Sequence, residues 1–141
     1  LLDEAMAVGK SRVYHPEAPA RTPDALLLIA EQLTGNGLRA ALAAAGWTGE
    51  ITVASLFGLD SGLALPGDLA LDGESALLAL LRSGRYGGLI ADPLLTALPG
   101  AEGMRLEKWV HPAVSSYLCT HDVPGLFGPE TEALLARWAQ G

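Results

Sequence analysis

Cysteine is nearly absent from this chain, and its scarcity excludes several kinds of site. Cys119 is the only cysteine among the 141 residues. A single thiol cannot form a disulfide bond within the chain, and it cannot supply the several thiolates of an iron–sulfur cluster. The histidines and carboxylates show no spacing typical of metal ligands either. We therefore predict no metal site and no cofactor in this chain, and the lack of disulfides favours a cytoplasmic protein.

Positive charge and long apolar runs are also scarce. Lys and Arg together number 9 against 16 Asp and Glu, which gives a formal net charge of −7. Nucleic acid or an anionic membrane would require a basic patch, so neither is expected as a partner. No run approaches the roughly 18 uninterrupted apolar residues of a membrane span. The first residues lack both an initiator methionine and the pattern of a signal peptide, so we expect the chain to be a piece of a longer protein.

The sequence does contain a regular alternation of apolar strands and helices. Residues 1–24 are predicted to form an N-terminal arm, with a short helical pattern followed by a proline-rich connector. Residues 25–141 are predicted to form the folded domain. Its expected strands are 25–30, 50–57, 88–91 and 104–110, and its expected helices are 38–45, 76–82, 93–98 and 129–138.

This order of elements predicts the fold class. Strands that alternate with helices through short turns favour βαβ units and a parallel sheet. We predict an α/β fold, namely a three-layer Rossmann-like domain with a mostly parallel sheet of about four strands. Residues 104–110 alternate between polar and apolar side chains, so they are expected at an exposed edge of the sheet. Asp72 or Ser75 is expected to cap helix 76–82, and Asp92 to cap helix 93–98.

Ligands of such sheets bind beyond the carboxyl ends of the strands. Four segments are expected to meet there, namely Glu31 to Gly37, Ser55 to Gly58, Asp92-Pro93 and His111 to Ser116. The candidate cavity-lining residues in these segments are Glu31, Gln32, Gly35, Asn36, Asp92, His111 and Ser115. The pattern identifies no catalytic residue among them.

The turn predicted at residues 31–37 has two interpretations. Gly35-Asn36-Gly37 stands at the entrance to a helix, where free backbone N–H groups can hold an anion. On this basis the chain would be a free-standing α/β module that binds a small anionic ligand. However, Gly-Asn-Gly matches no full phosphate-binding fingerprint, and Glu31 would repel phosphate. A tight turn with Thr34 or Asn36 as helix cap is therefore favoured.

Other side chains also have both a structural and a chemical interpretation. Asp92 before Pro93 is typical of a helix cap, although a carboxylate at a strand end is also a candidate general acid or base. Histidine side chains can act as ligands or proton carriers near neutral pH, so His111 is as readily a site residue as a turn residue. A thiol enzyme built on Cys119 and His121 is a weaker alternative, because catalytic partners normally come from different segments of the chain.

Several segments, taken in order, resemble a domain of the nitrogenase component 1-type oxidoreductases. They are Leu28 to Gln32, Asn36 to Arg39, Ile51 to Phe57, Pro66 to Leu69, Leu89 to Leu94 and His111 to Ser115. The resemblance runs from about residue 25 to residue 118. The family includes the molybdenum–iron nitrogenase subunits, their cofactor-assembly scaffolds and the dark-operative protochlorophyllide reductases.

The resemblance implies that the parent protein is an oxidoreductase with an iron–sulfur cluster or metallocofactor. This chain would be a C-terminal-type domain that forms part of the cofactor or substrate cavity and of a subunit interface, without being catalytic alone. Its partners would be other domains of the same chain, a sister subunit and an ATP-dependent iron–sulfur reductase. Cys119 matches no cluster ligand of the family, so no ligand is assigned. Glu31 to Arg39 and His111 to Ser115 are expected only to face the shared cavity.

Overall fold

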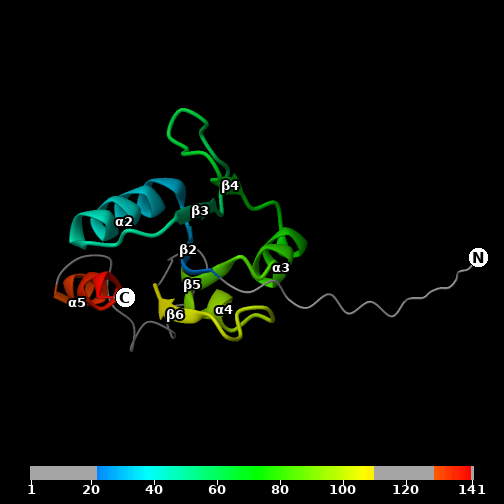
Figure 1. Cartoon of the computed structure of the whole chain (residues 1–141). Helices are drawn as coiled ribbons and strands as arrows, with labels where there is room; N and C mark the ends of the chain where they lie inside the picture. The colour runs from blue at the N-terminus through cyan, green and yellow to red at the C-terminus, as the bar shows by residue number, and fades with distance from the viewer. Residues whose placement is uncertain (1–21, 110–128, 141) are drawn as a thin grey trace, which may run out of the picture.

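The computed structural model describes residues 22–109 and 129–140. Within that part of the chain, five parallel strands form one sheet in the order β4-β3-β2-β5-β6. The strands are β2 (Thr22–Ala30), β3 (Ile51–Ser55), β4 (Leu69–Ala70), β5 (Tyr86–Ala91) and β6 (Arg105–Lys108). The predicted α/β Rossmann-like fold with a parallel sheet is therefore confirmed (Figure 1).

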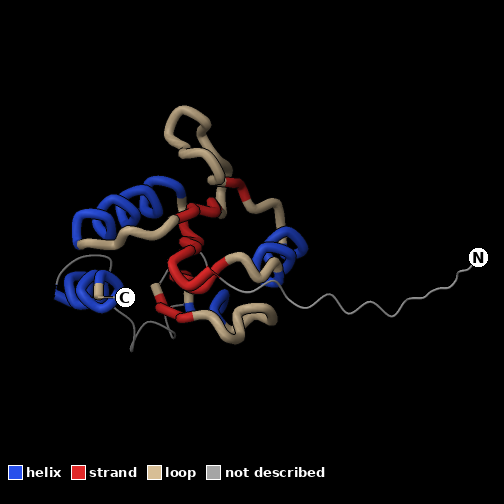
Figure 2. Tube along the Cα trace, viewed as in Figure 1, coloured by secondary structure: helices blue, strands red, loops and turns tan. Residues whose placement is uncertain are grey.

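Helices cover both faces of this sheet (Figures 1 and 2). One face carries α2 (Gln32–Ala45) and α5 (Pro129–Ala139), and the other carries α3 (Glu74–Arg82) and α4 (Pro93–Thr96). The core is divided accordingly, because successive residues of β2 point to opposite faces. Leu27 and Ile29 pack in the cluster with α3 and α4, whereas Leu26 and Leu28 pack with α2 and α5.

The central strands are apolar because both of their faces are covered. β2 lies between β3 and β5, with Leu27 opposite both Thr52 and Leu89. Residues 25–30 and 88–91 are buried, as their apolar runs without alternation predict. β6 pairs only with β5 among the described strands, and Arg105 and Leu106 are exposed on it. The prediction of a partly exposed edge strand is confirmed.

Two glycines allow helices to approach the sheet closely. A Cβ atom added at Gly35 would lie 2.7 Å from Cγ1 of Val53, and one added at Gly88 would lie 2.7 Å from Cζ3 of Trp138. Both distances are far shorter than a van der Waals contact, so any side chain would push α2 or α5 away from the sheet. Packing therefore explains why α2 contains a glycine near its start despite the low helix propensity of that residue.

The glycine-rich turn predicted at residues 31–37 is instead the start of a helix. α2 begins at Gln32, and the backbone N–H of Gly35 donates to the backbone carbonyl of Glu31 at 2.8 Å. The Glu31 side chain caps the helix by accepting hydrogen bonds from two backbone N–H groups. The prediction is wrong because it relied on the helix-breaking tendency of glycine, which the packing of Gly35 against the sheet overrides.

Two predictions are corrected and one is confirmed between β4 and α4. β4 is a fifth strand that the sequence did not reveal, since a strand of two residues has no detectable period. α3 begins after Gly73, which adopts a φ of 105°, and no side chain caps it. Neither Asp72 nor Ser75 therefore has the predicted capping role. α4 begins as predicted, with Asp92 as N-cap and Pro93 at the start of the helix.

Several predicted segments lie outside the described residues. They include residues 1–21 of the N-terminal arm, and also His111, Ser115, Cys119 and His121. β2 begins at Thr22, inside the stretch predicted as connector. Among the helices of residues 22–109 and 129–140, none is both long enough and apolar enough to cross a membrane.

Candidate functional site

The strand order reverses at the carboxyl edge of the sheet, between β2 and β5. β2 is followed by α2 on one face, whereas its neighbour β5 is followed by α4 on the other face. In doubly wound sheets the connections diverge at such a point and leave a crevice in which ligands bind. Glu31 follows β2 and Asp92 follows β5, so the fold brings these two predicted site residues to the two sides of the reversal.

Both of these carboxylates serve as helix caps. Glu31 accepts hydrogen bonds from the backbone N–H groups of Leu33 at 3.1 Å and Thr34 at 3.2 Å, and from the Thr34 hydroxyl at 3.1 Å. Asp92 is fully buried and accepts from the backbone N–H of Leu94 at 3.0 Å. A carboxylate already occupies the place where a helix N-terminus would hold an anion, so the start of α2 is unfavourable for phosphate.

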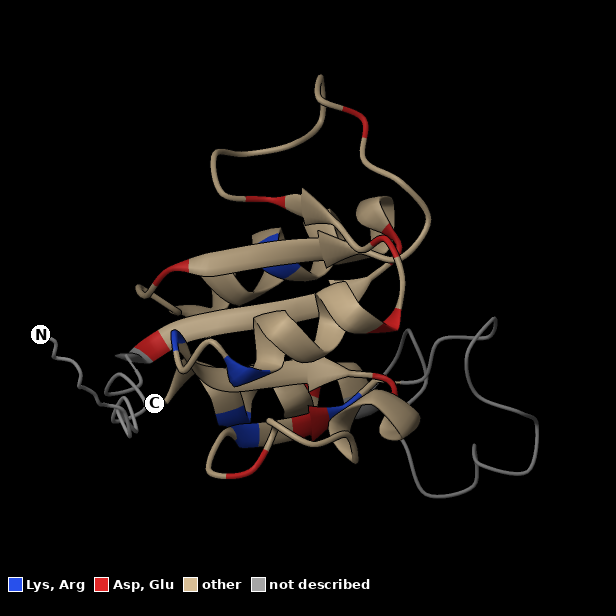
Figure 3. Cartoon of the chain, turned by 90° about the vertical axis from the view of Figure 1, so that its right-hand side faces the viewer, with Lys and Arg blue, Asp and Glu red and all other residues tan. Residues whose placement is uncertain are grey.

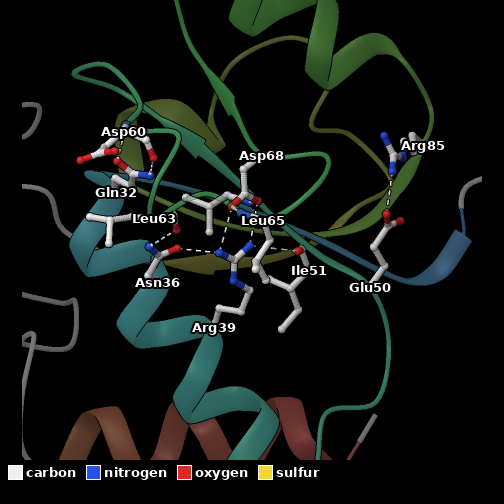
Figure 4. Close-up of polar contacts among 11 residues, drawn as sticks. Gln32, Asn36, Arg39, Glu50, Ile51, Asp60, Leu63, Leu65, Asp68 and Arg85 are labelled. Atoms are coloured by element: carbon white, nitrogen blue, oxygen red, sulfur yellow. Dashed lines mark hydrogen bonds and ion pairs between the residues drawn. The ribbon is translucent and has the colours of Figure 1, made fainter.

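Gln32 and Asn36 contact the loop between β3 and β4 (Figure 4). Gln32 donates from Nε2 to the backbone carbonyl of Asp60 at 2.9 Å and accepts from the Asp60 backbone N–H at 2.8 Å. Asn36 donates from Nδ2 to the backbone carbonyl of Leu63 at 3.0 Å. Gly35, the residue predicted beside them, is buried between α2 and the sheet. Gln32 and Asn36 therefore attach the loop to the helix rather than present free polar groups, and Gly35 packs against the sheet.

A buried ion pair anchors the base of the same loop. The side chain of Asp68 is 1% exposed, and it accepts from Arg39 Nη1 at 2.7 Å and Nη2 at 2.9 Å. It also accepts from the backbone N–H groups of Val53 and Leu65, each at 2.9 Å. Arg39 donates further to Asn36 Oδ1 at 2.6 Å. We call the set of side chains that joins α2 to β3 and to the loop the loop clamp; it consists of Gln32, Asn36, Arg39, Asp60 and Asp68.

The electrostatics of the loop clamp favour the charged form of its carboxylate. Burial raises the pKa of Asp68, but the hydrogen bonds from Arg39, Val53 and Leu65 and the positive charge of Arg39 together outweigh this effect. The pKa of Asp68 therefore lies below its ordinary value of 3.8. Asp68 is ionised at neutral pH, and its charge is compensated by Arg39, whose side chain is 11% exposed.

Large apolar side chains are exposed at the carboxyl edge of the sheet. Leu33 in the first turn of α2 is 65% exposed, Phe57 just beyond β3 is 63% exposed, and Leu94 in the first turn of α4 is 50% exposed. We call these three side chains the apolar edge. Exposed apolar groups that gather on one side of a domain are typical of a surface that another chain or domain covers.

Arg39 and Asp68 are two of the loop-clamp residues that the sequence analysis did not identify as site residues. They lie in two of the segments that carry the family resemblance, Asn36 to Arg39 and Pro66 to Leu69. The sequence does contain a hint that Arg39 forms an ion pair. No Lys or Arg occurs between Arg39 and Arg82, whereas several carboxylates do, so Arg39 is the nearest preceding basic partner for them. The sequence does not indicate which carboxylate Arg39 meets, because the two partners are 29 residues apart and are brought together only by the fold.

The described residues contain no arrangement that would hold a metal ion. Over residues 22–109 and 129–140, no group of three or more histidine, cysteine, aspartate or glutamate side chains has suitable geometry. The candidate residues His111 and Ser115 lie outside these ranges, so their relation to Glu31 and Asp92 stays a prediction. A scan against protein-family models and searches of curated proteins and of solved structures found no match to this chain.

Proposed function

We propose that this chain is a Rossmann-like domain of a nitrogenase component 1-type oxidoreductase, in which it forms one wall of a cofactor or substrate cavity and part of a subunit interface. The apolar edge is the observation that carries the proposal. Leu33, Phe57 and Leu94 are each at least half exposed at the edge where ligands of such sheets bind. A neighbouring domain that covers them would gain about 1–2 kcal/mol for each side chain, since a third to a half of each is already buried.

The support behind the edge is rigid, which suits a surface that docks. The Glu31 and Asp92 caps fix the first turns of α2 and α4, where two of the three apolar side chains lie. The loop clamp fixes the loop that begins beside Phe57. A surface that is already ordered loses less conformational entropy on association than a mobile one. The geometry therefore favours a preformed wall.

The same contacts indicate how chemistry is divided in the proposed assembly. The carboxylates at the reversal point are used as caps, so this domain contributes shape and apolar surface rather than a reactive group. The family resemblance supplies the other half of the proposal. Other domains and a sister subunit would hold the cluster or metallocofactor, and an ATP-dependent iron–sulfur reductase would deliver the electrons.

The wall is tested by hydroxyl-radical footprinting of the complete gene product, assembled with its sister subunit, against the 141-residue chain alone. We expect oxidation of Leu33, Phe57 and Leu94 to fall severalfold in the assembly. Leu106 is 44% exposed and serves as the internal control, because it lies on the edge strand β6, which β5 separates from β2 and β3. Equal oxidation of the apolar edge in both samples would refute the proposal.

The assignment to the nitrogenase component 1 type is tested separately. The assembled protein is expected to contain iron and acid-labile sulfide, and its cluster is expected to be reduced when the ATP-dependent iron–sulfur reductase and ATP are added. If the assembly protects the apolar edge but contains neither iron nor another redox cofactor, the role as a cavity wall would stand and the assignment to an oxidoreductase would be refuted. The two parts of the proposal therefore fail independently.

A further inference from the structure

The chain contains a single asparagine, Asn36, and the residue that follows it is Gly37. An Asn-Gly pair is the sequence in which asparagine loses its side-chain amide most readily, because glycine has no side chain in the way and lets the backbone adopt the conformation that the reaction needs. Both residues lie in α2, where Asn36 is half-buried and Gly37 is exposed. A Cβ atom added at Gly37 would meet nothing within 4 Å, so this part of the helix backbone is uncrowded.

The reaction needs only water. The backbone nitrogen of Gly37 forms a bond to Cγ of Asn36, and the bond between Cγ and Nδ2 breaks. The amide leaves as ammonia with the proton that the Gly37 nitrogen gives up, and a five-membered succinimide ring remains. Water then opens the ring at one of its two carbonyl carbons. The product is either an aspartate or an isoaspartate, in which the main chain runs through Cγ and is one carbon longer.

The fold opposes this reaction through the loop clamp. Asn36 donates from Nδ2 to the backbone carbonyl of Leu63 at 3.0 Å, and its Oδ1 accepts from Arg39 Nη2 at 2.6 Å (Figure 4). In an α-helix each backbone N–H is also turned toward the carbonyl four residues earlier, away from the preceding side chain. The Gly37 nitrogen can therefore reach Cγ only when the amide leaves the clamp and this part of α2 opens.

The opening that the reaction needs is local. Residues 34–37 have the sequence Thr-Gly-Asn-Gly, and all four have low helix propensity, whereas residues 38–45 are mostly alanine and leucine. The first turns of α2 are held mainly by the Glu31 cap, by the packing of Gly35 and by the clamp. Opening of these turns costs less free energy than unfolding of the whole domain.

We propose that Asn36 is a site of spontaneous deamidation, that opening of the loop clamp sets the rate of the reaction, and that its products detach the β3–β4 loop from α2. Gln32, Asn36 and Arg39 are spaced by four and then three residues, so they lie on one face of the helix. An isoaspartate would insert a main-chain carbon between Gln32 and Arg39 and would end this alignment.

The aspartate product also weakens the clamp. Its carboxylate oxygen would face the carbonyl of Leu63, so two acceptors would meet where a hydrogen bond is now made. Its charge would compete with Asp68 for Arg39. The inference goes beyond the proposed cavity wall and does not depend on it, although the released loop would begin beside Phe57 of the apolar edge.

The rate is measured by mass spectrometry of the 141-residue chain at mildly alkaline pH, with and without urea. The readout is specific because the chain has no second asparagine. We expect the folded chain to convert about tenfold to a thousandfold more slowly than the chain in urea, and still measurably. Gly37→Ala keeps Asn36 and creates no new contact, and it should convert about tenfold more slowly than the wild type in urea.

Two further variants separate opening of the clamp from global unfolding. Asp68→Ala removes the partner of Arg39 and should accelerate conversion of the folded chain about tenfold. Gly88→Ala destabilises the domain through Trp138, on the other side of β2, and should leave the rate unchanged. Acceleration by both variants in proportion to their loss of global stability would refute control by the clamp. Conversion as fast in the folded wild type as in urea would refute it too, and no conversion of the folded chain would refute the site.

The effect of the products is measured by hydrogen exchange. Aged wild type is separated from unreacted protein by anion exchange, because each product carries one more negative charge. We expect faster exchange in residues 56–68 and in the first turns of α2, with the slowest amides of β2 and β5 little changed. Unreacted protein from the same sample and aged Gly37→Ala are the controls. Unchanged exchange in residues 56–68 of the products would refute detachment of the loop, and none of these results bears on the footprinting test of the wall.

Discussion

The two halves of the sheet, β3 and β4 at one edge and β5 and β6 at the other, are stabilised by different interactions. On the side of β3 and β4, the long loop between these strands is attached to α2 through the polar contacts of the loop clamp. On the side of β5 and β6, α5 is attached through Trp138, whose ring packs against Gly88 and lies 4.0 Å from the guanidinium carbon of Arg105. Figure 3 shows acidic residues along the loop, and both basic and acidic residues near β5 and β6.

This comparison indicates that a segment that buries little apolar surface is held in place by polar contacts instead of apolar packing. The β3–β4 loop leaves Leu63 and Leu65 about half exposed and Phe57 more exposed still, so it buries little of its apolar surface. Its position depends on a few directional hydrogen bonds. α5 instead buries Leu134 and Trp138 almost completely, and Arg137 and Trp138 add polar contacts to Glu107 on β6. We therefore expect substitutions on the α5 side to destabilise the whole domain, and substitutions in the loop clamp to act first on the loop.

Trp138→Ala is expected to have the largest effect. The side chain is 1% exposed, contacts Trp47 at a ring-centroid distance of 5.9 Å, and donates from Nε1 to Glu107 at 2.9 Å. Its removal leaves a cavity beside β5, and the free energy of unfolding should fall by about 5 kcal/mol, the upper end for deletion of a buried aromatic residue. Urea denaturation followed by circular dichroism measures it. Trp138→Phe should cost clearly less, and a loss below about 1 kcal/mol for the alanine variant would contradict the packing described.

Asp68→Ala is expected to cost about 3–5 kcal/mol, because it leaves Arg39 without its partner in a mostly buried position. It also removes the acceptor of the Val53 and Leu65 backbone N–H groups. Hydrogen exchange should show the effect first in residues 56–68, whereas the slowest amides of β2 and β5 change only through global stability. Uniform acceleration across the sheet, with no excess in the loop, would mean that the clamp does not act locally.

The loop clamp also predicts a dependence of stability on pH. The pKa of Asp68 in the folded state lies below its ordinary value of 3.8, so the ionised group stabilises the fold fully above that value. The contribution is lost as the pH falls through the lower folded-state pKa. Asp68→Asn cannot titrate, so the stability difference between this variant and the wild type should shrink below about pH 4. A difference that stays constant from neutral to strongly acidic pH would contradict the shift.

Glycine substitutions compare the helix contacts on the two sides. Gly88→Ala should cost about 1–3 kcal/mol, because the new Cβ would lie 2.7 Å from Trp138 and 3.1 Å from Cδ1 of Leu26. Gly35→Ala creates an equally close contact with Val53, but the better helix propensity of alanine should offset about 1 kcal/mol of the cost. Gly37→Ala, which meets no neighbour, is the control and should stabilise slightly. A more stable Gly88→Ala variant would show that α5 can move away at no cost.

The sequence predicted those parts of the fold that depend on local patterns. It did not predict the contacts of the candidate site, which depend on residues far apart in the chain. The buried runs at residues 25–30 and 88–91 predicted the two central strands, and Asp92-Pro93 predicted a capped helix. The start of α2 was predicted wrongly, because Gly35 is explained only by the position of Val53 in a neighbouring strand. The partnership of Arg39 and Asp68 escaped prediction for the same reason, since it depends on contacts across 29 residues. Long-range contacts are the part of the structure that periodicity and capping patterns do not report.

The smallest effect is expected for the exposed ion pair between Arg85 and Glu50. Its N–O distance of 2.7 Å equals that of Arg39 and Asp68, but its side chains are 50% and 52% exposed. Water and salt screen exposed charges, so a double-mutant cycle with Arg85→Gln and Glu50→Gln should give a coupling energy of no more than about 0.5 kcal/mol, abolished by high salt. The corresponding cycle with Arg39→Gln and Asp68→Asn should give a coupling energy several times larger that persists in salt. Equal coupling in the two cycles would mean that distance rather than burial sets the strength of these pairs.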